Sequence, residues 1–195
     1  MLIKRMHAAL RIFGPLSCVC WLALFSIAAA HSQNLPRYTS LKEVRERGVV
    51  MQQWETSCAA ATIATVLTYG FGDPVSEAHV AASMLKKSDA VTVKQRGGFS
   101  LLDMKHFVED RGYTGRGYKH LSINDLKAFQ APIVPIDNYG FNHYVVVNGV
   151  RDDEVFLADP AFGNRKMGLE QFNRVWIDGM AFVVTANGKN VKKAD

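Results

Sequence analysis

The chain has 195 residues, 48% of them hydrophobic, which is too short for two full domains and too apolar for a disordered chain. The net charge is +5, but Lys4, Arg5 and Arg11 supply three positive charges in a start without acids; removing them leaves 20 Lys and Arg against 18 Asp and Glu, or +2. Phosphate binding needs Lys and Arg concentrated on one face, and no such stripe appears, so no nucleic-acid partner is expected.

Residues 1–30 have the pattern of a secretory signal. A basic start precedes an apolar run over about residues 12–27, and three alanines follow at residues 28–30. We predict cleavage after Ala30, export of the protein, and no membrane contact after cleavage. The alternative is an uncleaved membrane anchor, because the run approaches the roughly 18 apolar residues of a spanning helix. Gly14, Pro15 and the small residues favour cleavage.

Cleavage would also change the cysteine count. Cys18 and Cys20 would leave with the signal, so that Cys58 becomes the only cysteine, without an intramolecular partner. Oxidising compartments favour paired cysteines, so a solitary one is either an inert buried thiol or a thiol kept for its reactivity. The count alone does not separate these two readings.

The remaining chain divides into a polar lead-in segment (31–48) with a short helix near residues 40–44, a body (49–186), and a basic tail (187–195). Hydrophobic periodicity and capping residues predict helices over residues 57–69, 77–86, 100–111, 122–129 and 169–176. Runs rich in β-branched and aromatic residues predict strands over residues 133–136, 143–150, 155–158 and 180–185. This order predicts an α+β fold with an antiparallel sheet.

Cys58 stands at the start of the first helix of the body. If Ser57 caps that helix, Cys58 occupies its first turn, where unpaired N–H groups and the helix dipole favour a thiolate. The alternative is simple packing, because small residues and buried cysteines are common in cores.

A thiolate nucleophile needs a histidine to move protons, and His143 is the best candidate. It follows a loop and opens a strand, where a rigid scaffold presents a side chain. His79 and His106 lie inside predicted helices, and His120 lies in a polar connection. We expect these three histidines to be surface or packing residues.

Asp159 is the candidate partner of His143. If Val150 pairs with Glu154 across the hairpin, paired residue numbers sum to 304, and His143 and Asp159 share one face as diagonal neighbours. A two-residue turn would make the sum odd and put the two side chains on opposite faces. We predict the even sum, because it also groups apolar residues of both strands on that face. Pro160 then ends the strand, although an Asp-Pro pair by itself is typical of a plain turn.

Cys58, His143 and Asp159 together provide the nucleophile, base and orienting group of thiol acyl transfer. Gln52 or Gln53 supplies a candidate side-chain donor for the oxyanion beside the Cys58 N–H. We expect no cofactor. A metal site is also not expected, because no H-E-x-x-H or C-x-x-C spacing occurs.

Four ordered blocks carry a resemblance to a known family. They are Gln52–Ala61, Gly98–Lys105, Asn142–Val147 and Leu157–Pro160. Over about residues 49–184 the chain resembles the family C39 cysteine peptidases. The resemblance implies a papain-like fold, with Cys58 as nucleophile, His143 as base, Asp159 as orienting residue and Gln52 in the oxyanion hole.

The best-known members of the family cut leader peptides after a Gly-Gly pair at the front of peptide-exporting ABC transporters. This chain has no ATPase motif and is similar to stand-alone exported members, some of which accompany functional-amyloid secretion systems. We therefore expect a periplasmic cysteine endopeptidase that cleaves a secreted polypeptide, with components of such a system as partners. The alternative is a catalytically silent peptide-binding module that recognises a secretion substrate or partner.

Two positions depart from the family pattern. Ala59 follows the cysteine where the family usually has Gly, and Glu55 stands where it often has Asp. Ala59 leaves two consequences open, a narrower cleft or altered activity.

Overall fold

The computed structural model describes residues 39–186, in which helices come first and strands second, as the sequence order predicts. The proposed signal (1–30), its cleavage site and the basic tail (187–195) lie outside the described residues. Among the residues described, no helix has the length and apolar character needed to cross a membrane.

Six strands form one sheet in the order β1-β6-β2-β3-β4-β5, and all neighbouring strands are antiparallel. The strands are β1 (Tyr113–Tyr118), β2 (Ile133–Asn138), β3 (Phe141–Arg151), β4 (Glu154–Asp159), β5 (Gly163–Gly168) and β6 (Ala181–Ala186). The helices are α2 (Leu41–Glu46), α3 (Cys58–Thr65), α4 (Glu77–Leu85), α5 (Ala90–Arg96), α6 (Leu101–Asp110), α7 (Ile123–Lys127) and α8 (Leu169–Val175). A π-helical turn (Val66–Gly70) extends α3, and a 3-10 turn (Ile177–Gly179) precedes β6. The predicted α+β class with an antiparallel sheet is confirmed.

The sequence analysis did not predict three of the elements, β1, β5 and α5. The β1 segment, YTGRGY, contains two glycines, and the β5 segment, GNRKMG, has a glycine at each end and no apolar alternation. Both are edge strands of the sheet, so each pairs with a neighbouring strand on one side only. The α5 segment, AVTVKQR, contains three β-branched residues, although Asp89 caps its start and left-handed Gly97 ends it.

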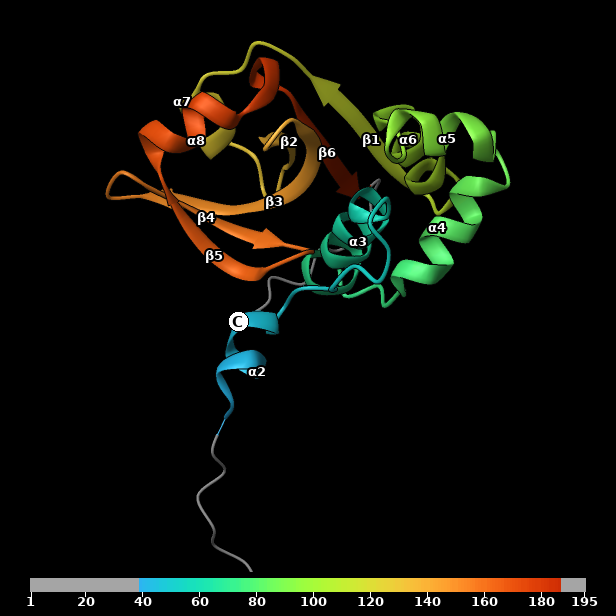
Figure 1. Ribbon diagram of the computed structural model, residues 1–195, viewed down its shortest axis with the longest axis horizontal. Coiled ribbons are helices and arrows are strands. Elements are labelled where there is room, and N and C mark those ends of the chain that lie inside the picture. The colour runs from blue at the N-terminus through green and yellow to red at the C-terminus, as the bar shows by residue number, and fades with distance from the viewer. Residues whose placement is uncertain (1–38, 187–195) are drawn as a thin grey trace, which may run out of the picture. The chain divides into compact units, whose positions relative to one another are not determined.

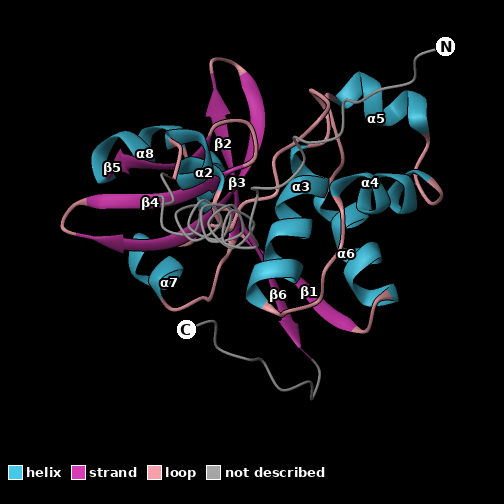
Figure 2. Cartoon of the chain, turned by 90° about the horizontal axis from the view of Figure 1, so that it is seen from below, coloured by secondary structure: helices cyan, strands magenta, loops and turns pink. Residues whose placement is uncertain are grey.

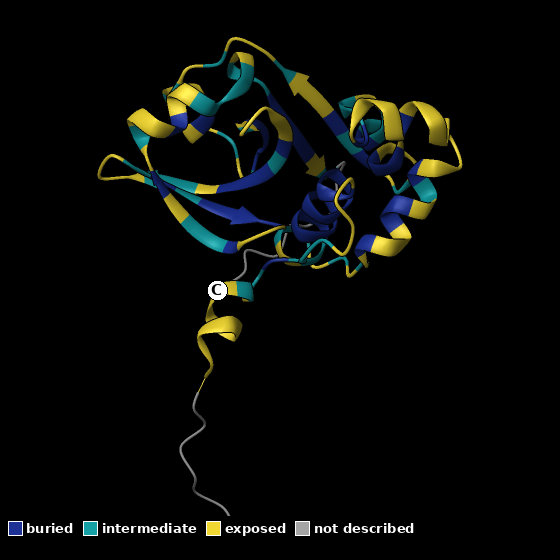
Figure 3. Ribbon diagram, viewed as in Figure 1, coloured by how far each residue is buried: buried dark blue, intermediate teal, exposed yellow. Residues whose placement is uncertain are grey.

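The helices cover both faces of the sheet (Figures 1 and 2). One hydrophobic core joins α3, α4 and α6 to residues of β2, β3 and β6, and a second core joins α7 and α8 to the strands. All eight residues of α3 are buried, so that the helix is dark blue along its length in Figure 3. Its alanines make this position possible, because small side chains allow a helix to lie close to its neighbours.

The β3–β4 hairpin corrects our prediction of its turn. Val150 pairs with Val155, not with Glu154, because the turn has two residues, Asp152 and Asp153, both with positive φ. The pairing sum is therefore odd at the turn. The register then shifts between Val147 and Gly149, and Val147 pairs with Leu157, which restores the even sum of 304. The extra residue, Asn148, forms a β-bulge.

Candidate active site

Cys58 is the first residue of α3, as expected, and its side chain is buried. The expected side-chain cap by Ser57 is absent. The Ser57 hydroxyl instead donates to the Trp54 carbonyl oxygen at 2.8 Å and accepts from the Trp54 N–H at 3.3 Å, which closes the turn before the helix. Cys58 nevertheless lies in the first turn, where backbone N–H groups lack partners within the helix.

His143 and Asp159 meet as the sequence predicts. His143 Nε2 lies 2.8 Å from Asp159 Oδ1, and both side chains are almost completely buried. Because Nε2 is engaged by Asp159, Nδ1 is the ring nitrogen left for another partner. The other histidines of the described region, His79, His106 and His120, are exposed.

Asp159 is fully buried and has several donors around it. Oδ1 accepts from the backbone N–H groups of Ala161 at 2.9 Å and Phe162 at 3.3 Å, and Oδ2 accepts from Arg165 Nε at 2.7 Å. The sequence analysis missed Arg165, because it lies on the unrecognised strand β5. These donors keep the buried carboxylate charged and fix its position.

The electrostatics of the pair favour two charged groups. Burial by itself lowers the pKa of His143, but hydrogen bonds and charge interactions with Asp159 and Cys58 outweigh burial and raise it to about 9. Burial would raise the pKa of Asp159, whereas the His143 interaction, the Ala161 N–H and the Arg165 charge lower it. His143 is therefore imidazolium at neutral pH, the form that stabilises a neighbouring thiolate.

Gln52 lies beside the turn that follows Asp159. Its backbone N–H donates to the Pro160 carbonyl oxygen at 2.8 Å, and its side-chain Nε2 donates to the Trp54 carbonyl oxygen at 3.1 Å. An amide nitrogen has two hydrogens, so Nε2 retains a second donor. Gln53 is exposed, and its backbone N–H donates to buried Glu77.

Cys58 opens into a narrow cleft of about 120 Å³. The cleft is lined by Cys58, Arg96, Gly97, Gly98, Phe99, Ser100, Leu101, Asn142 and Tyr144. Arg96 Nε donates to the Gly98 carbonyl oxygen at 3.1 Å, and its Nη2 contacts Asp103 at 2.9 Å, which holds the glycine pair in place. Ala59 is not among the residues that line the cleft; it is fully buried in the core behind Cys58.

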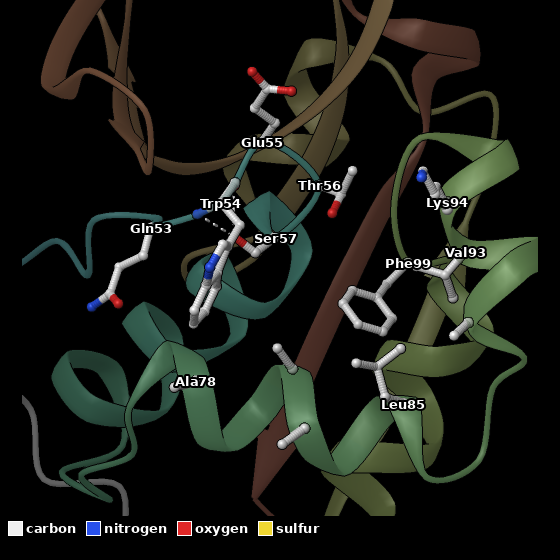
Figure 4. A pocket seen from close by; sticks show the side chains of 13 residues that line it. Gln53, Trp54, Glu55, Thr56, Ser57, Ala78, Leu85, Val93, Lys94 and Phe99 are labelled. Carbon is white, nitrogen blue, oxygen red and sulfur yellow. Dashed lines mark hydrogen bonds between the residues drawn. The ribbon is translucent and has the colours of Figure 1, made fainter.

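A larger hollow of about 780 Å³ lies next to this cleft. Its lining is mainly apolar and comes from the segment before Cys58 and from α4 and α5. In Figure 4 the Trp54 indole and the Phe99 ring lie over the helix that carries Ala78 and Leu85. Phe99 lines both hollows, which are therefore neighbours.

No cluster of three or more His, Cys, Asp or Glu side chains among residues 39–186 could hold a metal ion.

Solved structures share this fold. The chain matches the crystal structure of a double glycine motif protease from an AMS/PCAT transporter in complex with the leader peptide, with TM-score 0.59 and 26% identity over 73% of this chain and 96% of that one. It also matches the peptidase domain of Streptococcus ComA, described as a bi-functional ABC transporter involved in quorum sensing, with TM-score 0.60, 21% identity, and coverage of 71% and 98%. The fold is thus that of the papain-like cysteine peptidases.

Sequence comparison defines the family. The Peptidase C39 family model matches residues 46–189, and the chain belongs to this family of cysteine peptidases. The probable functional amyloid protease FapD of Pseudomonas aeruginosa is 35% identical over 155 residues, which cover 77% of this chain and 67% of that protein. FapD of Pseudomonas fluorescens is 35% identical over 150 residues, with coverage of 76% and 65%. The chain thus spans about two thirds of the length of these relatives.

Proposed function

We propose that Cys58 is the nucleophile of this peptidase, His143 its general base and acid, Asp159 the residue that orients His143, and Gln52 an oxyanion donor. One observation carries the proposal: a buried histidine hydrogen-bonded to the buried Asp159 carboxylate, in a chain that also has a buried cysteine at a helix start. This is the arrangement that activates a thiol for acyl transfer.

The chemistry follows from these positions. The Cys58 thiolate attacks the scissile carbonyl carbon, and the carbonyl oxygen becomes an oxyanion. The His143 imidazolium then gives its proton to the leaving amine as the C–N bond breaks, which leaves a thioester. Water, deprotonated by His143, hydrolyses the thioester and restores the thiolate. Asp159 holds the ring in position and stabilises its charged form.

The oxyanion would be held by the Cys58 backbone N–H and Gln52 Nε2. Gln52 is preferred to Gln53 because its side chain is the less exposed of the two and its backbone is bonded to the turn after Asp159. Gln53 instead lines the larger hollow.

The two hollows suggest the form of the substrate. The cleft at Cys58 is narrow and contains two glycines, so it fits small residues, such as a Gly-Gly pair, immediately before the cut bond. Gly98 has little room for a side chain, because a Cβ there would lie 3.1 Å from the Thr56 carbonyl oxygen, closer than an ordinary contact. The apolar hollow fits apolar side chains further from the cut. The related double glycine motif protease was crystallised with its leader peptide, which supports a polypeptide substrate of this kind.

The cellular setting is inferred from the relatives and from residues 1–30. Two relatives are named as probable functional amyloid proteases, so we place this peptidase in a secretion or functional-amyloid system. Its partners would be the exported polypeptide and components of that system. Export to the periplasm rests on the signal pattern of the sequence.

The test compares wild-type protein with Cys58→Ala. The first measurement is cleavage of a synthetic peptide with an apolar segment before Gly-Gly, beside a control peptide in which Leu-Leu replaces Gly-Gly. The second is the rate of iodoacetamide alkylation of Cys58 across pH. We expect wild type to cut only the Gly-Gly peptide, Cys58→Ala to cut neither peptide, and His143→Gln to slow the alkylation of Cys58. Peptide binding without cleavage, together with alkylation that does not depend on His143, would instead identify a silent binding module.

A further inference from the structure

The turn Asp159–Asn164 is held by contacts from several parts of the chain. Asp159 Oδ2 accepts from Arg165 Nε, and the backbone of Gln52 donates to Pro160. The guanidinium of Arg165 also lies over the Phe162 ring, 5.6 Å from its centroid. The turn therefore carries Asp159 and contacts Gln52, and its position decides where the carboxylate lies.

The lead-in helix α2 contacts the same turn. Arg45 Nη2 donates to the Phe162 carbonyl oxygen at 2.6 Å, and Asn164 Nδ2 donates to the Arg47 carbonyl oxygen at 2.7 Å. Gly163 has φ +78°, and a Cβ there would lie 2.6 Å from the Arg45 carbonyl oxygen. Glycine is thus required both by the backbone conformation and by the close approach of α2.

A short series of hydrogen bonds connects Arg45 to the Asp159 carboxylate. Arg45 holds the carbonyl of Phe162, whose own N–H donates to Asp159 Oδ1. From the other side, Arg165 holds Oδ2. The start of α2 is itself fixed by a reciprocal capping box between Ser40 and Glu43, so the helix is an ordered support.

We propose that α2 and Arg165 together position the Asp159 carboxylate against His143, so that the segment preceding the peptidase core belongs to the catalytic machinery. The proposal rests on the proposed function of His143 and Asp159. The family match begins at residue 46, after most of α2, so it leaves this helix out. Arg45 and Arg165 are positioning residues, because they act on His143 through Asp159 and its turn.

The experiment uses the full chain and two measurements. The first is the titration of the His143 ring by NMR, which reports its coupling to Asp159 directly. The second is the pH dependence of Cys58 alkylation by iodoacetamide. The variants are Arg45→Ala, Arg45→Lys, Arg165→Gln and Arg165→Lys. The matched control is Arg174→Ala, which removes an exposed arginine that pairs with Glu170 on α8.

Loss of correct positioning weakens the stabilisation of the His143 imidazolium. We expect Arg165→Lys and Arg45→Ala each to lower the His143 midpoint by about half a pH unit, a threefold change in the ratio of charged to neutral ring. Arg165→Lys keeps the charge but loses the planar donor. Arg45→Lys should keep most of the wild-type behaviour, because an ammonium group can still donate to the Phe162 carbonyl. Arg165→Gln also removes a positive charge that disfavours the imidazolium, so its midpoint should lie above that of Arg165→Lys.

The outcomes distinguish failure of the positioning role from failure of the proposed catalytic function. If neither Arg45→Ala nor the Arg165 variants move the His143 titration more than Arg174→Ala does, the proposal is overturned. An effect at Arg165 without one at Arg45 overturns the part assigned to α2. If His143→Gln itself leaves Cys58 alkylation unchanged, the proposed function fails. The NMR titration of the arginine variants still decides whether they position Asp159.

Discussion

His143 Nε2 lies 2.8 Å from Asp159 Oδ1 because the β3–β4 ladder passes over Asn148 and leaves it unpaired. The two-residue turn of the hairpin, followed without interruption, would place the two side chains on opposite faces of the sheet. The bulge changes the register by one before the strands reach His143. The meeting of these two residues thus depends on Asn148, an exposed residue in the middle of β3, staying outside the pairing.

Deletion of Asn148 should leave His143 beside Asp159. Gly149 pairs with Phe156 and Val147 pairs with Leu157, so the ladder already passes over Asn148, and its removal keeps the same partners. Peptide cleavage is the measurement, and the deletion variant should remain active. Asn148→Ala, which keeps the extra residue, is the control and should also remain active. A deletion variant that folds but no longer cuts the peptide would show that the strands change their pairing when the bulge is lost.

Replacement of His143 by Ala should abolish cleavage and slow Cys58 alkylation at neutral pH, because the base and the imidazolium partner are both lost. His106→Ala is the matched control, since that side chain is exposed on α6. Cleavage rates of the two purified variants provide the comparison. An equal loss at His106 would mean that the base has been misassigned.

The variant Asp159→Asn should retain the shape of the site and lose the charge that stabilises the imidazolium. We expect lower turnover with a smaller loss than in Cys58→Ala, and a His143 midpoint below about 9. Turnover and an NMR titration of His143 measure the two effects. An unchanged rate would reduce Asp159 to a turn residue.

Gln52→Ala should reduce turnover by about 100- to 1,000-fold, the usual cost of one oxyanion donor. Alkylation of Cys58 should remain nearly normal, because the donor acts on the tetrahedral oxygen and not on the resting thiolate. Gln53→Ala is the control and should have little effect on either rate. If Gln53→Ala were the more damaging change, the assignment of the oxyanion donor would have to move by one residue.

Stability should depend on the charge of His143. Its pKa in the folded protein is raised from 6.5 to about 9, so its charged form stabilises the fold fully below about pH 6.5. This contribution is lost as the pH rises through about 9. The melting temperature of wild type should thus exceed that of His143→Gln most at about pH 6 and approach it at about pH 10. A difference independent of pH between these limits would contradict the assigned charge state.

The fold class and the candidate residues of the site could be read from local sequence patterns. Helical periodicity placed Cys58 at the start of α3, and the run of β-branched residues placed His143 on a central strand. These features depend on local spacing and on the residues of one segment, which a sequence displays directly.

The tertiary structure alone decided how those residues come into register. The two-residue turn makes the paired residue numbers sum to an odd number, and the Asn148 bulge restores the even sum. No residue type in this segment predicts the shift, because a bulge depends on how two strands pair. Arg165 lies on a strand without apolar alternation, and the contact between Arg45 and Phe162 joins residues 117 positions apart. Such long-range contacts arise from packing between elements, so they have no signature in the segments that make them.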